Sequence, residues 1–149
     1  MILINDSVVY MGSSAQRPLT KLPKGNWLVK FDPERLCFYL ERTKDFVLPD
    51  KIYGDTKKLS KRYLNTFKQR STNLGVLLSG LKGTGKSLTA RYTAIESELP
   101  VIIVSEPFGG VEFNQFLTQI GQECVIFFDE FEKEVDEIFY PKRTKEINA

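Results

Sequence analysis

The chain has 149 residues, of which 42% are hydrophobic and 27% charged, and its formal net charge is +2. This is ordinary globular composition, and so small a charge does not by itself argue for a nucleic-acid partner. The two cysteines, Cys37 and Cys124, exclude a disulfide framework and lie in no metal-ligand spacing. Because there is no histidine, any acid or base chemistry falls to carboxylates, lysine or tyrosine.

The sequence does not predict a membrane segment. The opening MILIND does not have the pattern of a signal peptide, and no apolar run reaches the length that spans a bilayer. We therefore expect a cytoplasmic protein without a membrane partner.

Residues 1–55 predict a small β-rich region. Residues 8–11 are β-prone, and two strand-like runs at residues 27–31 and 36–41 flank the turn residues Asp32, Pro33 and Glu34. A hairpin is the simplest interpretation of this pattern.

Residues 56–70 predict an amphipathic helix. Leu59, Tyr63 and Phe67 recur every four residues between lysines and arginines, and Asp55 or Thr56 is the expected cap. The basic run is interpreted as a solvated helix face.

Three short apolar runs follow, at residues 74–79, 101–104 and 125–128. Helical patterns at residues 86–97 and 113–120 separate them, and Gly121 is expected to stop the second helix. Continuous apolar strands separated by helices predict a parallel α/β sheet that is covered on both faces.

The sequence GLKGTGKS at residues 80–87 fits the phosphate-binding P-loop pattern, or Walker A motif, at every fixed position. Its glycines let backbone N–H groups wrap a phosphate at the start of a helix. In this pattern Lys86 reaches the β- and γ-phosphates of a nucleotide and Ser87 ligates Mg²⁺. The residues assigned to nucleotide binding here are Gly80, Leu81, Lys82, Gly83, Thr84, Gly85, Lys86, Ser87 and Leu88.

The run VIFFDE at residues 125–130 has the Walker B pattern of four apolar residues followed by two acids. Ligands of open α/β sheets sit at the carboxyl ends of the strands, which is where Asp129 is expected. We expect Asp129 to hold Mg²⁺ through water and Glu130 to polarise the attacking water, with Glu130 and Lys86 as the catalytic residues.

On these two motifs the chain resembles the AAA+ ATPases, over about residues 51–133. The resemblance implies a P-loop NTPase-like sheet with flanking helices, ATP with Mg²⁺ as the bound cofactors, and a homo-oligomer in the complete protein. Ile52, Tyr53 and Gly54 are similar to the stretch whose backbone meets adenine in many members. Phe108, Gly109 and Gly110 lie where unfoldases carry a pore loop, although a simple turn leading into the helix also fits.

The expected function is Mg²⁺-dependent ATP binding and, in a complete assembly, ATP hydrolysis. A nucleotide-binding module without turnover is one alternative. A DNA-handling ATPase such as a helicase loader is another, in which the basic helix is the contact face. A kinase built on the same loop is disfavoured, because the two acids suit attack by water.

We expect residues 56–149 to form an incomplete AAA+ core, truncated after the Walker B strand. Only nineteen residues follow Glu130, and they contain no buried-strand pattern. The family's strand between the two motif strands therefore has no counterpart here. Either a missing C-terminal segment or another chain supplies it, or the two motif strands pair directly. This expectation predicts a chain that is a weak ATPase alone.

Overall fold

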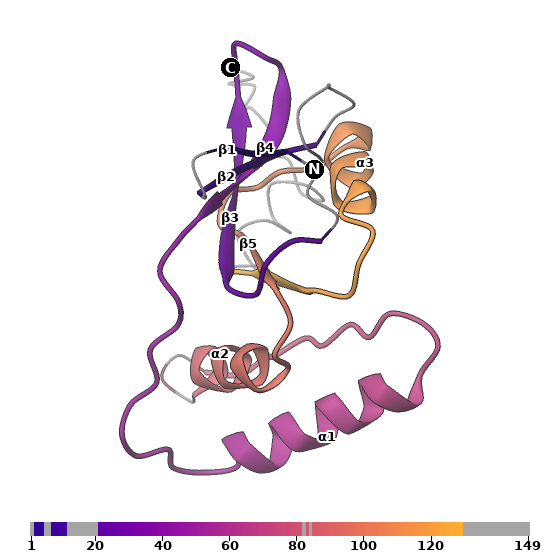
Figure 1. Ribbon diagram of the computed structural model, residues 1–149. Helices are drawn as coiled ribbons and strands as arrows, with labels where there is room; N and C mark the ends of the chain where they lie inside the picture. The colour runs from indigo at the N-terminus through magenta and orange to yellow at the C-terminus, as the bar shows by residue number, and fades with distance from the viewer. Residues whose placement is uncertain (1, 5–6, 12–20, 82, 84, 130–149) are drawn as a thin grey trace, which may run out of the picture. The chain divides into compact units, whose positions relative to one another are not determined.

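A computed structural model describes residues 2–4, 7–11, 21–81, 83 and 85–129 (Figure 1). The chain divides into two compact units, one made of residues 1–43 with 100–149 and the other of residues 44–99. Within the described residues, no helix combines the length and apolarity needed to cross a membrane.

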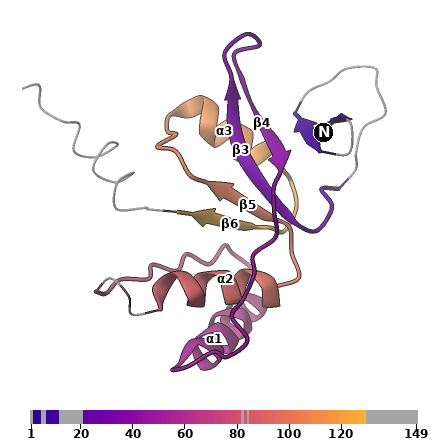
Figure 2. The same cartoon turned by 90° about the vertical axis from the view of Figure 1, so that its left-hand side faces the viewer.

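The first unit contains a mixed sheet whose strand order is β1-β2-β4-β3-β5-β6. The pairs on the N-terminal side are antiparallel, whereas β3–β5 and β5–β6 are parallel. Figure 2 shows the arrows of β5 and β6 side by side and pointing the same way. The strands span Ile2–Ile4 (β1), Val8–Tyr10 (β2), Asn26–Asp32 (β3), Cys37–Arg42 (β4), Val101–Val104 (β5) and Val125–Phe128 (β6).

The predicted hairpin is confirmed as β3 and β4, with Phe31 opposite Phe38 and Asp32 opposite Cys37. It closes on Asp32, whose carboxylate accepts hydrogen bonds from the amides of Glu34 and Arg35. These backbone donors, Arg35 first, hold the pKa of Asp32 below its usual value. The turn chemistry read from the sequence therefore does close the hairpin.

The hairpin is also continuous with the strands that follow it in the chain. Trp27 pairs with Ile102 across β3 and β5, so residues from both ends of the first unit share one sheet. The expected division into residues 1–55 and 56–149 stays a prediction, but the sheet crosses that boundary.

Helix α3, Val111–Gln119, covers one face of this sheet (Figure 1). Its apolar residues Phe113 and Phe116 recur at helical spacing and are buried against the strands. Gly110 with φ 91° precedes the helix, and Gly121 with φ 61° follows it, so the predicted stop is confirmed. The core beneath the helix consists of Val9, Leu22, Trp27, Val29, Leu40, Ile102 and Val104 together with Phe113, Phe116 and Ile120.

The second unit is inserted between β4 and β5. Its two ends leave the first unit at neighbouring points, because Thr43 N–H donates to the carbonyl of Asn26 at 2.9 Å. Val101 N–H donates to the carbonyl of Gly25, also at 2.9 Å. The insertion thus begins and ends on adjacent residues of one segment.

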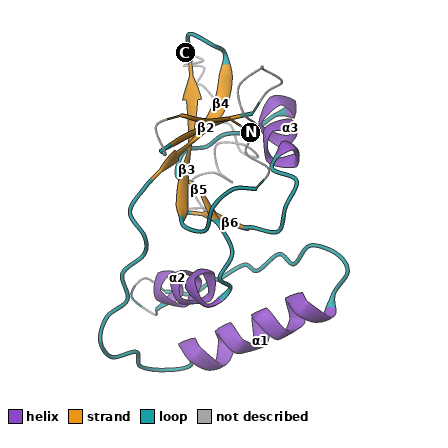
Figure 3. Ribbon diagram, in the orientation of Figure 1, coloured by secondary structure: helices purple, strands orange, loops and turns teal. Residues whose placement is uncertain are grey.

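Two helices make up the regular structure described in residues 44–99: α1, Thr56–Gln69, and α2, Lys86–Glu96 (Figure 3). Both were predicted. Asp55 is the N-cap residue of α1, but its side chain makes no capping hydrogen bond, so the expected side-chain cap is wrong. Its φ of −90° and ψ of 8° lie outside the extended region that aims a cap side chain at the first amides.

The buried strand predicted at residues 74–79 is also wrong, since the structure has no strand there. Val76 is 45% exposed and Leu77 is 74% exposed. An apolar run is buried as a strand only when other strands lie beside it. The described part of its own unit contains helices and no strand, so the run has no sheet edge there to join.

A long-range clamp joins the segment before β3 to the segment before β6. Leu22 N–H donates to Oε1 of Gln122 at 2.7 Å, and Nε2 of Gln122 donates to the carbonyl of Leu22 at 3.3 Å. One amide side chain thus satisfies both backbone groups of the buried Leu22.

Replacing Gln122 by alanine should leave the Leu22 amide without its partner. We expect Gln122→Ala to lower the free energy of unfolding by about 1–2 kcal/mol in a urea titration. The matched control is Gln119→Ala, which removes a glutamine side chain that is exposed at the end of α3 and should change stability by less than about 0.5 kcal/mol. Equal urea midpoints for the two variants would contradict the clamp.

Candidate functional site

The glycine-rich loop at residues 80–87 opens directly into α2. Gly80 has φ 147°, while Gly83 and Gly85 both have φ 84°, a conformation that L side chains rarely adopt. Gly85 is the N-cap residue of α2, and its carbonyl accepts the helical hydrogen bond from Thr89 N–H at 2.9 Å. The loop therefore turns into the helix through backbone that requires glycine.

The start of α2 has no anionic partner in the described chain. No side chain caps it, and its first turn contains no acidic residue. Free amides and the positive end of the helix dipole thus remain available at Lys86, Ser87 and Leu88, an arrangement that favours a bound anion. Ser87 is exposed, and Lys86 and Leu88 are half-buried.

Lys86 points back at the loop from which it emerges. Its Nζ donates a hydrogen bond to the carbonyl of Gly80, the first residue of the loop. The ammonium group therefore lies against the loop backbone, where a phosphate held by the loop would compete for it. Leu81 is 81% exposed, and the assigned residues Lys82 and Thr84 lie outside the described residues.

A buried hydrogen bond ties α1 to the same helix. The hydroxyl oxygens of Thr56 and Thr89 lie 3.2 Å apart, and both side chains are buried. Thr56 comes two residues after Gly54, and Thr89 two residues after Ser87. The structure therefore anchors the start of α1 on the first turns of α2, a contact that the sequence analysis did not anticipate because threonine has no distinctive spacing signal.

The possible adenine-contacting stretch lies just before this anchor. Ile52 is half-buried, Tyr53 is 78% exposed, and Gly54 has φ 76°. A backbone turn at Gly54 leads into α1. Its contact with a nucleotide stays a prediction.

In the first unit, the strand predicted at residues 125–128 is confirmed as β6, paired in parallel with β5. Asp129 follows directly, and its N–H donates to the carbonyl of Val104 at 3.1 Å, which continues the pairing by one residue. The Asp129 side chain is exposed. Its carboxylate is a hard oxygen ligand of the kind that suits Mg²⁺. Glu130 lies outside the described residues.

The described residues contain no cluster of three or more His, Cys, Asp or Glu side chains that would hold a metal by themselves. Mg²⁺ bound with a nucleotide takes ligands from phosphate oxygens and water as well as from one or two protein oxygens. That is the usual coordination of Mg²⁺ in phosphoryl-transfer sites. The Ser87 hydroxyl and the Asp129 carboxylate are each an oxygen donor of a kind that suits Mg²⁺.

Phe108 is a packed residue. Its ring centroid lies 5.1 Å from that of Phe38 and 5.8 Å from that of Phe113, and Gly110 two residues later caps α3. Such aromatic contacts hold the ring against the core. This geometry favours the turn leading into α3 over a pore loop.

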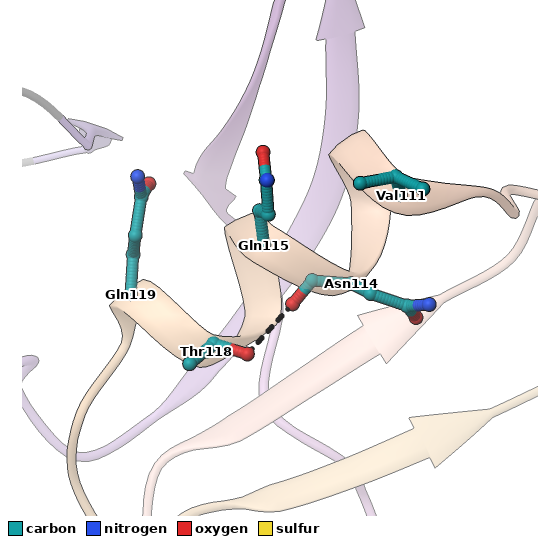
Figure 4. Close-up of a pocket in the computed structure, with 5 residues that line it drawn as sticks. All are labelled: Val111, Asn114, Gln115, Thr118 and Gln119. Carbon is teal, nitrogen blue, oxygen red and sulfur yellow. Dashed lines mark hydrogen bonds between the residues drawn. The ribbon is translucent and has the colours of Figure 1, made fainter.

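Two further features carry no chemistry. Burial raises the pKa of the Cys124 thiol, which disfavours the reactive thiolate. A shallow hollow along the outer side of α3 is lined by Val111, Asn114, Gln115, Thr118 and Gln119. The Thr118 hydroxyl donates a hydrogen bond to the Asn114 carbonyl at 2.9 Å (Figure 4). None of these five side chains is charged.

A glycine loop that opens a helix and a β5–α3–β6 crossover that ends in an acid are the elements of a P-loop NTPase-like α/β fold. Comparison with known proteins agrees. Residues 76–138 match the family model "ATPase family associated with various cellular activities (AAA)". The segment that carries both motifs is therefore similar to the AAA family of nucleotide-binding ATPases.

Two curated relatives match part of this chain. The "Uncharacterized AAA domain-containing protein ycf46" of Trieres chinensis is 39% identical over 72 residues, which cover 42% of this chain and 14% of the relative. The protein of the same name from Guillardia theta is 39% identical over 70 residues, covering 40% and 14%. The chain thus spans about a seventh of the length of these relatives. No solved structure gives a significant match.

The loop geometry predicts a difference between two glycines of the same unit. At Gly85 an added Cβ meets no atom within 4 Å, so the cost of Gly85→Ala comes from φ 84° alone. We expect Gly85→Ala to cost about 1–2 kcal/mol of stability in thermal unfolding and to weaken nucleotide binding.

Gly75→Ala is the matched control. An added Cβ there also meets nothing within 4 Å, and Gly75 has no positive φ. Its effect should stay below about 0.5 kcal/mol. If Gly75→Ala destabilised the protein as much as Gly85→Ala, the left-handed backbone of the loop would not be the cause.

Proposed function

We propose that this chain binds ATP with Mg²⁺ on residues 80–87 and, in a complete assembly, hydrolyses it. The observation that carries this proposal is the start of α2. Glycines at positive φ turn the chain into a helix whose first amides have no side-chain cap and no acidic neighbour, and Lys86 lies against the same loop. A terminal phosphate satisfies all of these groups at once.

Each assigned residue has a role in this proposal. Lys86 leaves the Gly80 carbonyl and places its charge on the β- and γ-phosphates, while the Ser87 hydroxyl and Asp129 hold the metal ion, Asp129 through water. Mg²⁺ supplies neutralisation of the phosphate charge. Glu130 orients and polarises the attacking water. The backbone at Ile52, Tyr53 and Gly54 contacts the adenine.

The wider setting of the activity belongs to the same proposal. Assembly into a homo-oligomer and a cytoplasmic location are both part of it. The cytoplasmic location is supported by two free cysteines, Cys37 and Cys124, which suit a reducing compartment. If ATP binds but is not hydrolysed, the chain is a nucleotide-binding module without ATPase activity.

The first test measures ATP affinity by calorimetry in the presence of Mg²⁺. Lys86→Ala removes the point charge on the terminal phosphates, and we expect affinity to fall by about ten- to a hundredfold. The matched control is Arg91→Ala, which removes a cation from the same helix. The Arg91 guanidinium lies over the ring of Phe46, 5.6 Å from its centroid. Unchanged affinity in Lys86→Ala would sink the assignment of the loop.

The second test distinguishes the roles of Asp129 and Glu130, and it uses the assembly that turns over ATP. Glu130→Gln keeps the shape but removes the base, so ATP should bind and persist while turnover falls by about 10²–10⁴-fold. Asp129→Asn should instead shift the Mg²⁺ concentration required for binding. Turnover at the parent rate in Glu130→Gln would show that another group activates the water.

A further inference from the structure

The helix α1 is a strongly cationic element. Of its fourteen residues, five are basic and none is acidic. All five basic side chains are exposed. At about 100° per residue they share an arc of about 140° with two exposed amides, while the apolar side chains occupy the other side. This basic face consists of Lys57, Lys58, Lys61, Arg62 and Lys68 together with Asn65 and Gln69.

The arrangement opposes the stability of the helix. Lys57 and Lys58 lie in the first turn, where the helix dipole disfavours positive charge. Lys57 with Lys61, and Lys58 with Arg62, are like-charge pairs at four-residue spacing, which destabilise a helix. In the part of the chain that the structure describes, no ion pair with a carboxylate relieves any of the five charges.

The charge is also concentrated in one unit. Residues 44–99 contain eleven Lys and Arg against five Asp and Glu, a net charge of +6, in a chain whose total is +2. The rest of the chain therefore carries −4. A solvated surface helix has no need of such a bias, since mixed charges keep it equally soluble.

The side of α1 opposite the basic face is buried or half-buried within the second unit. Thr56 and Ser60 are buried there, and the Thr56 hydroxyl is bonded to Thr89 of α2 at 3.2 Å. Leu59, Tyr63 and Phe67 on that side are half-buried. An external partner therefore meets α1 through its basic face.

We propose that the basic face of α1 binds the phosphate backbone of a nucleic acid. Lys57 and Lys68 lie eleven residues apart, so the face extends for about 16 Å along the helix. A duplex of that length presents on the order of ten phosphates. Asn65 and Gln69 between the cations are the polar donors that also bond phosphate oxygens.

The chemistry of the face separates this partner from two others. The centre of a protein–protein interface is usually depleted of charged residues, whereas the basic face is charged along its length and contains no apolar side chain. A helix that binds a membrane inserts its apolar side, whereas in α1 the apolar residues Leu59, Tyr63 and Phe67 are half-buried and the exposed side is the basic one. Because no aromatic side chain lies on the basic face, base stacking is absent and binding is independent of sequence.

The experiment uses the full chain and a fluorescently labelled duplex DNA of about 20 base pairs, titrated between about 50 and 200 mM salt. Lys57→Gln/Lys61→Gln removes two charges but keeps helix propensity. We expect its affinity for the duplex to fall about tenfold or more at the lower salt concentration. The slope of log affinity against log salt should become shallower by about 2, close to 0.9 for each lost phosphate contact.

Two further variants and one control test whether the positive charge of the basic face is the cause of duplex binding. Arg62→Gln/Lys68→Gln should reproduce the loss from the other cations of the face, and Lys57→Arg/Lys61→Arg should retain binding because the charge is kept. Lys21→Gln/Lys24→Gln removes two exposed lysines of the first unit and should bind like the parent. ATP affinity and circular dichroism should be unchanged in all of them, because none touches the loop.

Several outcomes would overturn the proposal. They are parent-like affinity in both glutamine variants, an equal loss in the Lys21/Lys24 control, or absence of binding to duplex DNA and to single-stranded DNA and RNA of the same length. Binding to phosphatidylserine vesicles without binding to any nucleic acid would assign the face to a membrane surface instead.

Discussion

The first amides of α2 have no carbonyl one turn earlier to bond, and the described chain offers them no side-chain cap. This constraint organises the second unit. Glycines at positive φ lead the backbone into the helix without a side chain in the way. The Lys86 ammonium donates a hydrogen bond to the carbonyl of Gly80 in the same loop. The Thr56–Thr89 bond then fixes α1 against the same turns. Within the described residues, the uncapped start of α2 therefore favours a bound anion.

In the first unit the position of Asp129 depends on β5. That strand lies between β3 and β6 and is parallel to both, so it places the end of β6 and the N-terminal hairpin in one sheet. Its residues Ile102 and Val104 are fully buried. The aromatic rings of Phe38, Phe113 and Phe116 pack across the strands and α3. The acid after β6 is therefore held by the most deeply packed part of the unit.

Local patterns in the sequence predicted the elements that local forces decide. The turn at Asp32, the four-residue period of α1 and the glycines of the loop all act within a few residues, and the structure has each of them. The run at residues 74–79 was mispredicted because its composition matches that of a buried strand, while its burial depends on neighbours that no local pattern encodes. The pairing of β3 with β5 and the contact of Gln122 with Leu22 join residues far apart in the chain, and neither leaves a periodic signal. The predicted side-chain cap at Asp55 is wrong because the ψ of Asp55, 8°, lies outside the extended region that a capping residue adopts.

The adjacent bonds at Gly25 and Asn26 have a consequence for how the protein is made. Residues 44–99 form a unit that is continuous in the chain, whereas the sheet of the first unit also needs β5 and β6, which come later in the sequence. During synthesis the helical insert can therefore fold while the earlier strands still lack two partners. When residues 101–128 emerge, they return to the point at which the chain left the sheet. Pairing β3 with β5 closes a loop made of the residues between them. A folded insert makes the flexible part of that loop shorter, which lowers the entropic cost of closing it.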